Sequence, residues 1–248
     1  MQEYLTIFMT FWSPAALEAN TIIFLNLAGA LLLGFVVGYE RFYHGRAAGM
    51  RTYGLVCMAS AALVVVAGYP DFWYGGRALH PIGADPTRVI QGVVTGIGFL
   101  GAGVIMKDGF SISGLTTAAS VWAASAIGVL VGVGFYAAAI LLALLSAASM
   151  VWVHRLEERL PSRAVLAISI TFRRNQQPAE KDLEQLAEKK GYEIGSDTLS
   201  IAVKDEVAEW RFVAVAVDKR NAIPMSALSD MIAQYPGVAG FTLAHARN

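Results

Sequence analysis

The first two-thirds of the sequence is a series of apolar segments, each close to the length that a helix needs to cross a membrane. A hydrocarbon core of ~30 Å requires about 20 apolar residues in α-helical conformation. Five segments come close to this length: 21–39, 52–69, 89–106, 115–131 and 135–153. The sequence therefore predicts an α-helical polytopic membrane domain with about five transmembrane helices.

Charged residues divide the chain into two parts of different character. Of all residues, 56% are hydrophobic and 15% are charged, whereas soluble domains carry about 25% charged residues. Residues 163–248 contain 11 Lys+Arg and 11 Asp+Glu, which leaves 8 of each for the first 162 residues. We therefore expect an interfacial segment at 1–19, a transmembrane domain at 20–160 and a soluble domain at 161–248. Neither part is basic, so we expect no nucleic-acid partner.

Arginines in the connecting segments predict the orientation. Three lie between the first two helices and three follow the fifth helix: Arg41, Arg46, Arg51, Arg155, Arg159 and Arg163. Five crossings place both groups on one side, which the positive-inside rule makes cytoplasmic. Arg77 and Arg88, on the opposite side, weaken this signal slightly. We expect the C-terminal domain to be cytoplasmic.

The pattern after Pro161 changes from apolar runs to alternation and helical periodicity. It predicts strands at 164–172, 192–203, 209–217 and 238–244, with helices at 179–190 and 224–235. The order βαββαβ is the ferredoxin-like arrangement. We therefore expect a soluble α+β domain of that type.

Glycines spaced four residues apart in the apolar segments favour close helix packing, because a missing side chain lets two backbones approach. The pairs are Gly34 with Gly38, Gly92 with Gly96, and Gly128 with Gly132. They predict a compact core built around the third and fourth helices. The alternative is that these glycines only reflect the high glycine content of membrane helices.

No enzymatic constellation stands out. Gly96-Ile-Gly98-Phe-Leu-Gly101 matches the dinucleotide pattern G-x-G-x-x-G, but it lies inside an apolar segment and lacks the acidic residue about 20 positions later. Cys57 is the single cysteine, and the four histidines lie in separate elements. We therefore predict that the chain is not an enzyme and has no organic cofactor.

Ionisable residues at the ends of the apolar segments are the candidate polar site. Glu40, Arg41 and Arg51 frame one end of the first two helices, and Asp85 with Arg88 precedes the third. Polar side chains that extend this set are Asn26, Gln91 and Thr95. Charged groups that enter hydrocarbon usually pair or line a polar pathway. The alternative reading is that these side chains only snorkel toward the headgroups.

Mg²⁺ as a ligand or transported ion is a further hypothesis, with Glu40 and Asp85 as weak candidates for metal binding. Mg²⁺ prefers carboxylates and water in octahedral geometry. The predicted topology places Glu40 and Asp85 on opposite sides, and no acidic residue falls near the midplane, where transporters usually bind coupling ions. This counts against a conventional transporter built from one chain.

Three strings resemble the MgtC/SapB family of bacterial inner-membrane proteins. They are Gly38-Tyr-Glu40-Arg41 with Ala48-Gly-Met-Arg51-Thr52, then Asp85-Pro-Thr-Arg88, and Gly96-Ile-Gly98-Phe-Leu-Gly101-Ala-Gly103-Val-Ile with Gly114-Leu-Thr116-Thr117-Ala-Ala. The resemblance covers residues 29–136. It implies five membrane helices followed by a cytoplasmic domain similar to the ACT fold.

The resemblance also implies a role. Members are tied to survival in low Mg²⁺ and to virulence inside host phagocytes, and inhibition of the proton-translocating ATP synthase is one action proposed for them. The positions that match the family strings are Glu40, Arg41, Arg51, Asp85 and Arg88, then Thr116 and Thr117 as polar contacts between helices. Gly98, Gly101 and Gly103 match as packing residues.

One departure concerns the soluble domain. Amino-acid-binding ACT domains usually have a glycine between the first strand and helix, and the loop 173–178 has none. We therefore expect this domain to form a homodimer or contact a partner rather than bind an amino acid. The leading hypothesis is a membrane regulator of another membrane complex. The alternative is a cation transporter with a polar path from Asp85 past Gln91 and Thr95 to Glu40.

Overall fold

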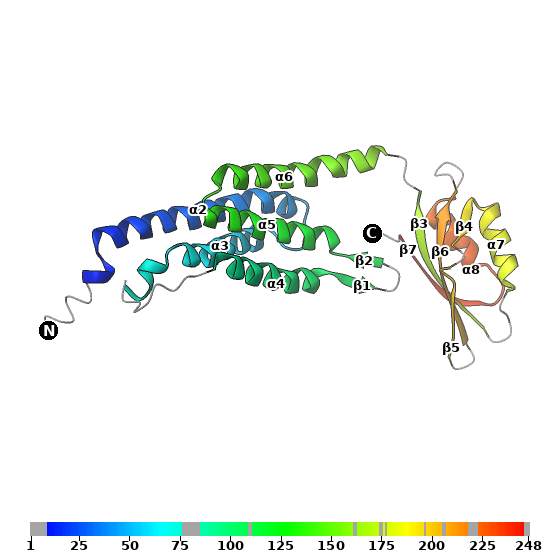
Figure 1. Ribbon diagram of the computed structural model, residues 1–248. Helices are drawn as coiled ribbons and strands as arrows, with labels where there is room; N and C mark the ends of the chain where they lie inside the picture. Colours follow the sequence, from blue (N-terminus) through cyan, green and yellow to red (C-terminus); the bar gives the residue numbers. More distant parts are fainter. Residues whose placement is uncertain are drawn as a thin grey trace. The chain divides into compact units, whose positions relative to one another are not determined.

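The computed structural model describes residues 9–75, 85–108, 111–160, 163–173, 176, 178–195, 197–204, 207–217 and 223–245. Its contacts divide the chain into two compact units (Figure 1). The first contains Met1–Ile105 and Gly114–Leu156, and the second contains Met106–Ser113 and Glu157–Asn248. The predicted outer-side residue Arg77 and three of the six residues of the loop 173–178 (174, 175 and 177) lie outside the described residues.

Among its described residues, the first unit contains five helices that are long and apolar enough to cross a membrane. They are α2 (Pro14–Tyr43), α3 (Met50–Gly68), α4 (Pro86–Val104), α5 (Leu115–Val133) and α6 (Tyr136–Arg159). A short 3₁₀ element, η1 (Pro70–Gly75), follows α3. The prediction of about five apolar helices of spanning length is confirmed.

The first spanning helix begins earlier than predicted. Ser13 is its N-cap, accepting a hydrogen bond from the Ala16 N–H at 3.2 Å, and Pro14 occupies the first turn. Residues 14–19, expected to belong to a separate interfacial segment, are therefore part of α2. Thirty residues at 1.5 Å each give a helix of about 45 Å, longer than the ~30 Å hydrocarbon core. At least one end of α2 therefore extends into the interfacial region.

Helices α2, α3 and α5 pack around each other and form the core of the first unit. Glycines make this possible. A Cβ added at Gly34 would lie 2.6 Å from the Tyr53 carbonyl oxygen, and one at Gly128 would lie 2.1 Å from the Cys57 carbonyl oxygen. Gly38 and Gly132 make similarly close approaches to α3. The backbones of α2 and α5 are therefore each in direct contact with α3. This agrees with the close packing that the glycine spacing of α2 and α5 predicted.

Helix α4 differs from the expectation of a glycine-rich core helix. Its buried residues are Val93 and Ile97. A Cβ added at any of four of its glycines would meet nothing within 4 Å, and one at Gly101 would make only an ordinary contact, 3.8 Å from the Ala118 Cβ. The four open positions are Gly92, Gly96, Gly98 and Gly103. These glycines therefore do not pack tightly within the chain.

A short hairpin that the sequence did not predict connects α4 to α5. Strands β1 (Met106–Asp108) and β2 (Ser111–Ser113) pair antiparallel. Helix α5 then starts at Gly114, whose φ is +88° and whose added Cβ would lie 2.0 Å from the Val104 carbonyl oxygen. Only glycine fits this turn. The hairpin thus brings the end of α4 next to the start of α5.

The second unit contains an antiparallel sheet and two helices. Apart from the β1–β2 hairpin, its described elements are β3 (Val165–Phe172), α7 (Glu180–Lys189), β4 (Tyr192–Ile194), β5 (Ser200–Lys204), β6 (Val207–Ala216), α8 (Met225–Ala233) and β7 (Val238–His245). The strand order is β4-β6-β3-β7, and β5 also pairs with β6. Both helices pack on one face of the sheet (Figure 1), where they contribute Leu183 of α7 and Leu228 and Ile232 of α8 to the core.

The strand predicted at 192–203 is in fact two strands. The Gly195 N–H bonds the Val213 carbonyl at 3.0 Å, and the Thr198 hydroxyl donates to the Gly195 carbonyl at 2.7 Å. The same hydroxyl accepts from the Val213 N–H at 3.1 Å. A threonine side chain therefore takes the place of a backbone partner, and β5 resumes with Ser200 opposite Arg211. Side-chain hydrogen bonds of this kind compete with the regular ladder.

Candidate functional site

A buried polar cluster joins the three core helices near one end of the first unit. Arg41 comes from the last turn of α2, Tyr53 from the first turn of α3, and Thr117 and Ser120 from the first two turns of α5. Arg41 Nη2 donates to Thr117 Oγ1 at 2.5 Å, and the Tyr53 and Ser120 hydroxyls are 2.5 Å apart. Ser120 also lies 3.0 Å from the Thr117 carbonyl oxygen. The cluster therefore fixes three helices to one another.

The cluster is almost closed to solvent. The exposed fraction is 7% for Arg41, 3% for Thr117 and 0% for Tyr53. Close approach at Gly38 explains how Tyr53 reaches this position, because a Cβ there would lie 2.7 Å from Met50 Cα and 3.1 Å from Tyr53 Cβ. A buried guanidinium is costly unless it is hydrogen-bonded. The hydroxyl of Thr117 supplies one such bond.

Glu40 adds a carboxylate beside this cluster. Its Oε1 lies 3.1 Å from His44 Nδ1. Its Oε2 and the Nε of Arg41 are buried, and neither has a hydrogen bond within the described part of the chain. A buried polar group without a partner calls for an explanation. Glu40 Oε2 is a hydrogen-bond acceptor and Arg41 Nε is a donor. A small polar ligand with one donor and one acceptor would satisfy both atoms.

The hydroxyl contacts between α3 and α5, which begin with Tyr53 and Ser120, form a row that includes one further pair and then ends. Ser60 of α3 and Ser125 of α5 are 2.9 Å apart. Beyond them the buried residues of the α3–α5 interface are apolar: Ala61, Val64, Val65, Ile127 and Val131. Asn26 lies apart from this row and accepts a bond from the Tyr136 hydroxyl of α6 at 2.8 Å. Polar contacts therefore do not continue along the described interface to the other end of the unit.

Asp85 and Arg88 lie at the opposite end of the unit, where α4 begins. Asp85 is the N-cap of α4, and its Oδ1 accepts from the Thr87 hydroxyl at 2.6 Å and the Thr87 N–H at 2.9 Å. These bonds hold the pKa of Asp85 below its usual value. Arg88 Nε is 3.8 Å from Asp85 Oδ2, and both side chains are exposed. Capping accounts for this carboxylate.

The predicted polar stripe on α4 faces outward. Gln91 and Thr95 are exposed, and the Thr95 hydroxyl donates to the Gln91 carbonyl of its own helix at 2.8 Å. Thr116 and Arg51 are also exposed, at the starts of α5 and α3. The path predicted from Asp85 past these side chains to Glu40 is therefore not formed within one chain.

Of the predicted site residues, the structure brings Arg41 and Thr117 into contact, with Glu40 adjacent. Sequence reasoning missed Tyr53 and Ser120. A signal was present for Ser120, since it lies three residues after Thr117 on the α5 face that continues to Gly128. No three His, Cys, Asp or Glu side chains in the described ranges come together as a metal site.

Known proteins match this chain in the part that contains the five apolar helices. The model of the MgtC family matches residues 27–159. The chain is 44% identical over 123 residues to the protein named "Protein MgtC" of Brucella abortus, an alignment that covers 50% of this chain and 45% of that protein. It is 43% identical over 122 residues to the "Putative magnesium transporter YhiD" of Escherichia coli K12, covering 48% and 54%.

A third relative is "Protein MgtC" of Salmonella typhimurium, 42% identical over 112 residues, with 44% of this chain and 43% of that protein covered. The chain thus spans about half the length of the curated relatives it matches. None of these three names describes an enzyme.

Proposed function

The chain belongs to the MgtC family, and we propose that it is a non-enzymatic membrane protein linked to Mg²⁺ homeostasis and adaptation to low Mg²⁺. In this proposal it regulates another complex of the bacterial inner membrane, such as the proton-translocating ATP synthase. The supporting observation is the contrast between two parts of the first unit. The polar cluster joins three core helices by side-chain hydrogen bonds, whereas α4 contacts α3 and α5 but buries only Val93 and Ile97.

Helix α4 is the surface proposed to meet the partner. Only Val93 and Ile97 of this helix are buried among its described residues, and Gly92 and Gly96 are two exposed positions without a side chain on its surface. Small residues allow a partner helix to approach closely in lipid, where van der Waals packing and hydrogen bonds drive association. Gln91 would offer an amide to such a partner. The cluster around Arg41 would then hold the core helices that carry α4.

Proton pumping by ATP synthase in inverted membrane vesicles tests this proposal. We expect the wild-type protein to co-purify with the synthase and reduce ATP-driven pumping, and Gly96→Leu to lose both effects. Gly29→Leu is the matched control, because Gly29 lies on α2 and an added Cβ there also meets nothing within 4 Å. Wild-type protein that neither binds a membrane complex nor alters pumping would contradict the proposal.

A second candidate function is cation transport. It is favoured by the name of the Escherichia coli relative and by the exposed row of Asp85, Gln91 and Thr95 along α4. Two copies that meet along α4 would bring two such rows together. Mg²⁺ flux into liposomes tests this function, with Asp85→Asn and Glu40→Gln as variants. Flux that either variant abolishes would establish transport, and its absence with folded protein would exclude it.

The soluble unit is proposed to be a cytoplasmic domain of the ferredoxin-like or ACT-like type. The strand order β4-β6-β3-β7, with both helices on one face, supports this assignment. The open face carries Ser169, Glu209 and Arg211, joined by hydrogen bonds of 2.7 to 2.9 Å. We assign this face to contact with a second copy or a partner.

Accessibility of an introduced cysteine tests the orientation. The native Cys57 is fully buried, so background labelling by a membrane-impermeant thiol reagent is expected to be low. Ser200→Cys on β5 should react in inverted vesicles and not in intact cells. The reverse pattern would place the domain outside the cytoplasm.

A further inference from the structure

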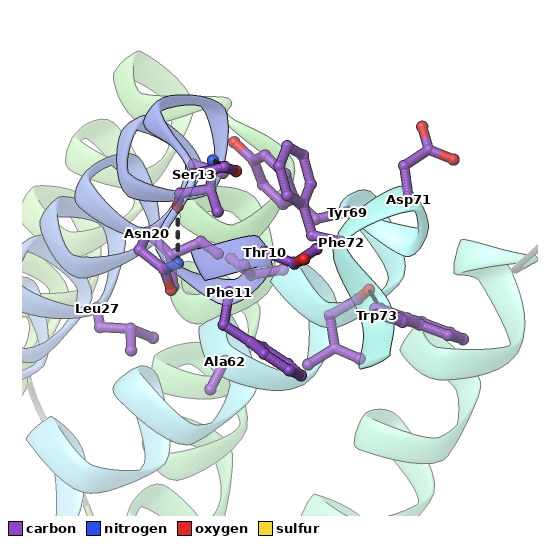
Figure 2. A pocket seen from close by; sticks show the side chains of 15 residues that line it. Thr10, Phe11, Ser13, Asn20, Leu27, Ala62, Tyr69, Asp71, Phe72 and Trp73 are labelled. Carbon is purple, nitrogen blue, oxygen red and sulfur yellow. Dashed lines mark hydrogen bonds between the residues drawn. The ribbon is translucent and has the colours of Figure 1, made fainter. Parts of the chain in front are cut away.

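A cavity of about 640 Å³ lies at the end of the first unit opposite the polar cluster. It is bounded by the residues before α2, the first half of α2, the end of α3 and η1. Figure 2 shows Ser13 and Asn20 on the α2 side and Tyr69, Phe72 and Trp73 on the other, with Phe11 between them. Ligand pockets in proteins typically measure ~300–1,000 Å³. The cavity is large enough for a small amphipathic molecule.

Most of the cavity wall is apolar. Ile23, Leu27, Ala62 and Val65 form the part that lies along the helices, which suits an alkyl chain. Aromatic rings gather toward the end of α3. The Tyr69 and Phe72 rings are 6.1 Å apart, and Trp73 is held in place because its Nε1 donates to the Val66 carbonyl at 2.8 Å.

The polar groups of the described lining are three hydroxyls, one amide, one carboxylate and one indole N–H, from Thr10, Ser13, Tyr69, Asn20, Asp71 and Trp73. Ser13 already accepts from the Ala16 N–H, and the Asn20 amide nitrogen already donates to the Ala16 carbonyl at 2.7 Å. The Asn20 carbonyl, the Tyr69 hydroxyl and the Asp71 carboxylate remain to receive hydrogen bonds from a ligand. No Lys or Arg is among the lining residues that the structure describes. Asp71 is therefore the one charged side chain of the described lining, and its carboxylate favours a cation with N–H donors.

We propose that this cavity binds an amphipathic molecule with a protonated amine head and an apolar tail. The tail lies along Ile23, Leu27 and Val65, and the amine lies toward Asp71. The rings of Tyr69 and Phe72 add cation–π attraction. Asp71 and the aromatic rings follow the end of α3, and aromatic residues at the ends of spanning helices are typical of the interfacial region, where an amine headgroup is stable.

Photolabelling of the full-length protein in lipid nanodiscs tests the proposal. The probe is a long-chain primary amine with a diazirine in its tail, and the matched probe is the alcohol of the same chain length. We expect saturable amine labelling of the peptides that contain residues 10–27 and 62–73, and weaker labelling by the alcohol. Equal labelling by the two probes, or labelling spread evenly over all lipid-facing helices, would overturn the proposal.

Three variants sharpen this experiment. Asp71→Asn should weaken amine binding about threefold to fivefold, as expected for an exposed ion pair. Glu18→Gln is the control for Asp71→Asn. Glu18 is an exposed acidic residue in the first half of α2, the part of the helix that borders the cavity, but its own side chain does not line the cavity. Ala62→Phe should fill the cavity and abolish labelling. Unchanged labelling in both Asp71→Asn and Ala62→Phe would refute the site.

Lipid composition distinguishes two sources of the amine. Nanodiscs made with phosphatidylethanolamine should protect the site from the probe if the natural ligand is a bilayer lipid, compared with nanodiscs of phosphatidylglycerol alone. Equal labelling in both nanodiscs, with the amine preference and the variant effects retained, assigns the site to a soluble amphipathic amine.

Discussion

Replacing Gly128 with alanine should force α3 and α5 apart. The new Cβ would lie 2.1 Å from the Cys57 carbonyl oxygen and 2.8 Å from Ser60 Cβ. The nearest atom is backbone, so no side-chain rotation relieves the overlap. To reach an ordinary contact of 3.4 Å the two helices must separate locally by about 1.3 Å.

The free energy of unfolding should fall by about 1–3 kcal/mol. Overpacking of this kind costs about 1–3 kcal/mol. The separation also strains the hydroxyl contacts Ser60–Ser125 and Tyr53–Ser120 across the same interface, each worth about 0.6 kcal/mol in a membrane protein. Alanine has a better helix propensity than glycine, which offsets about 0.5–1 kcal/mol of this loss.

Thermal unfolding of the detergent-purified protein measures the effect, with a thiol-reactive dye as the reporter. The dye reports helix separation directly, because Cys57 is the single cysteine, is fully buried and supplies the contacted carbonyl. Gly92→Ala is the matched control, since an added Cβ there meets nothing within 4 Å. It should unfold at the wild-type temperature or slightly above. Equal unfolding temperatures for the two variants would refute the packing argument.

Three further predictions follow from the polar groups. Thr117→Val leaves the buried Arg41 without its hydroxyl partner and should lower the free energy of unfolding by about 1–3 kcal/mol, whereas the exposed Thr116→Val should change thermal unfolding little. Asp85→Ala should reduce the protection of backbone amides at the start of α4 against hydrogen exchange. Asp85→Asn should leave this protection unchanged, because asparagine is also a good N-cap. Arg211 and, to a smaller extent, Ser169 donate hydrogen bonds to the Glu209 carboxylate and hold the pKa of Glu209 below its usual value. The ionised Glu209 therefore stabilises the second unit above pH ~4.3, and this stabilisation is lost as pH falls through the lowered pKa. Glu209→Gln should flatten the acid side of the stability profile measured by circular dichroism.

Each of these predictions has a contradicting result. Equal unfolding temperatures for Thr117→Val and Thr116→Val would mean that the bond to Arg41 contributes nothing. Protection at the start of α4 that is lost in Asp85→Asn as fully as in Asp85→Ala would point to the charge rather than the cap. An acid profile that does not change in Glu209→Gln would assign the pH dependence to other carboxylates.

Hydrophobic length and glycine spacing were enough to predict the five spanning helices and close packing at Gly34, Gly38, Gly128 and Gly132. The same spacing at Gly92 and Gly96 predicted packing that the structure does not show within the chain. A G-x-x-x-G pair states only that a helix can be approached closely. Whether a neighbour approaches depends on how the other helices are arranged.

Local sequence likewise predicted the alternating strands of the soluble unit but not the break between β4 and β5. That break depends on Thr198 bonding to Val213 of the neighbouring strand, a contact 15 residues away. The boundary of a strand follows from its partner's register as well as from its own residues.

The sequence by itself determined the membrane class of this protein, the change from apolar helices to a sheet-containing C-terminal region, and which charged residues lie near helix ends. Hydrophobicity and charge count act on each segment separately, so they can be read without the fold. Only the tertiary structure decided that Arg41 is buried against Thr117 and that Asn20, Tyr69 and Asp71 line one cavity. These facts depend on atoms far apart in the chain, and packing alone brings those atoms together.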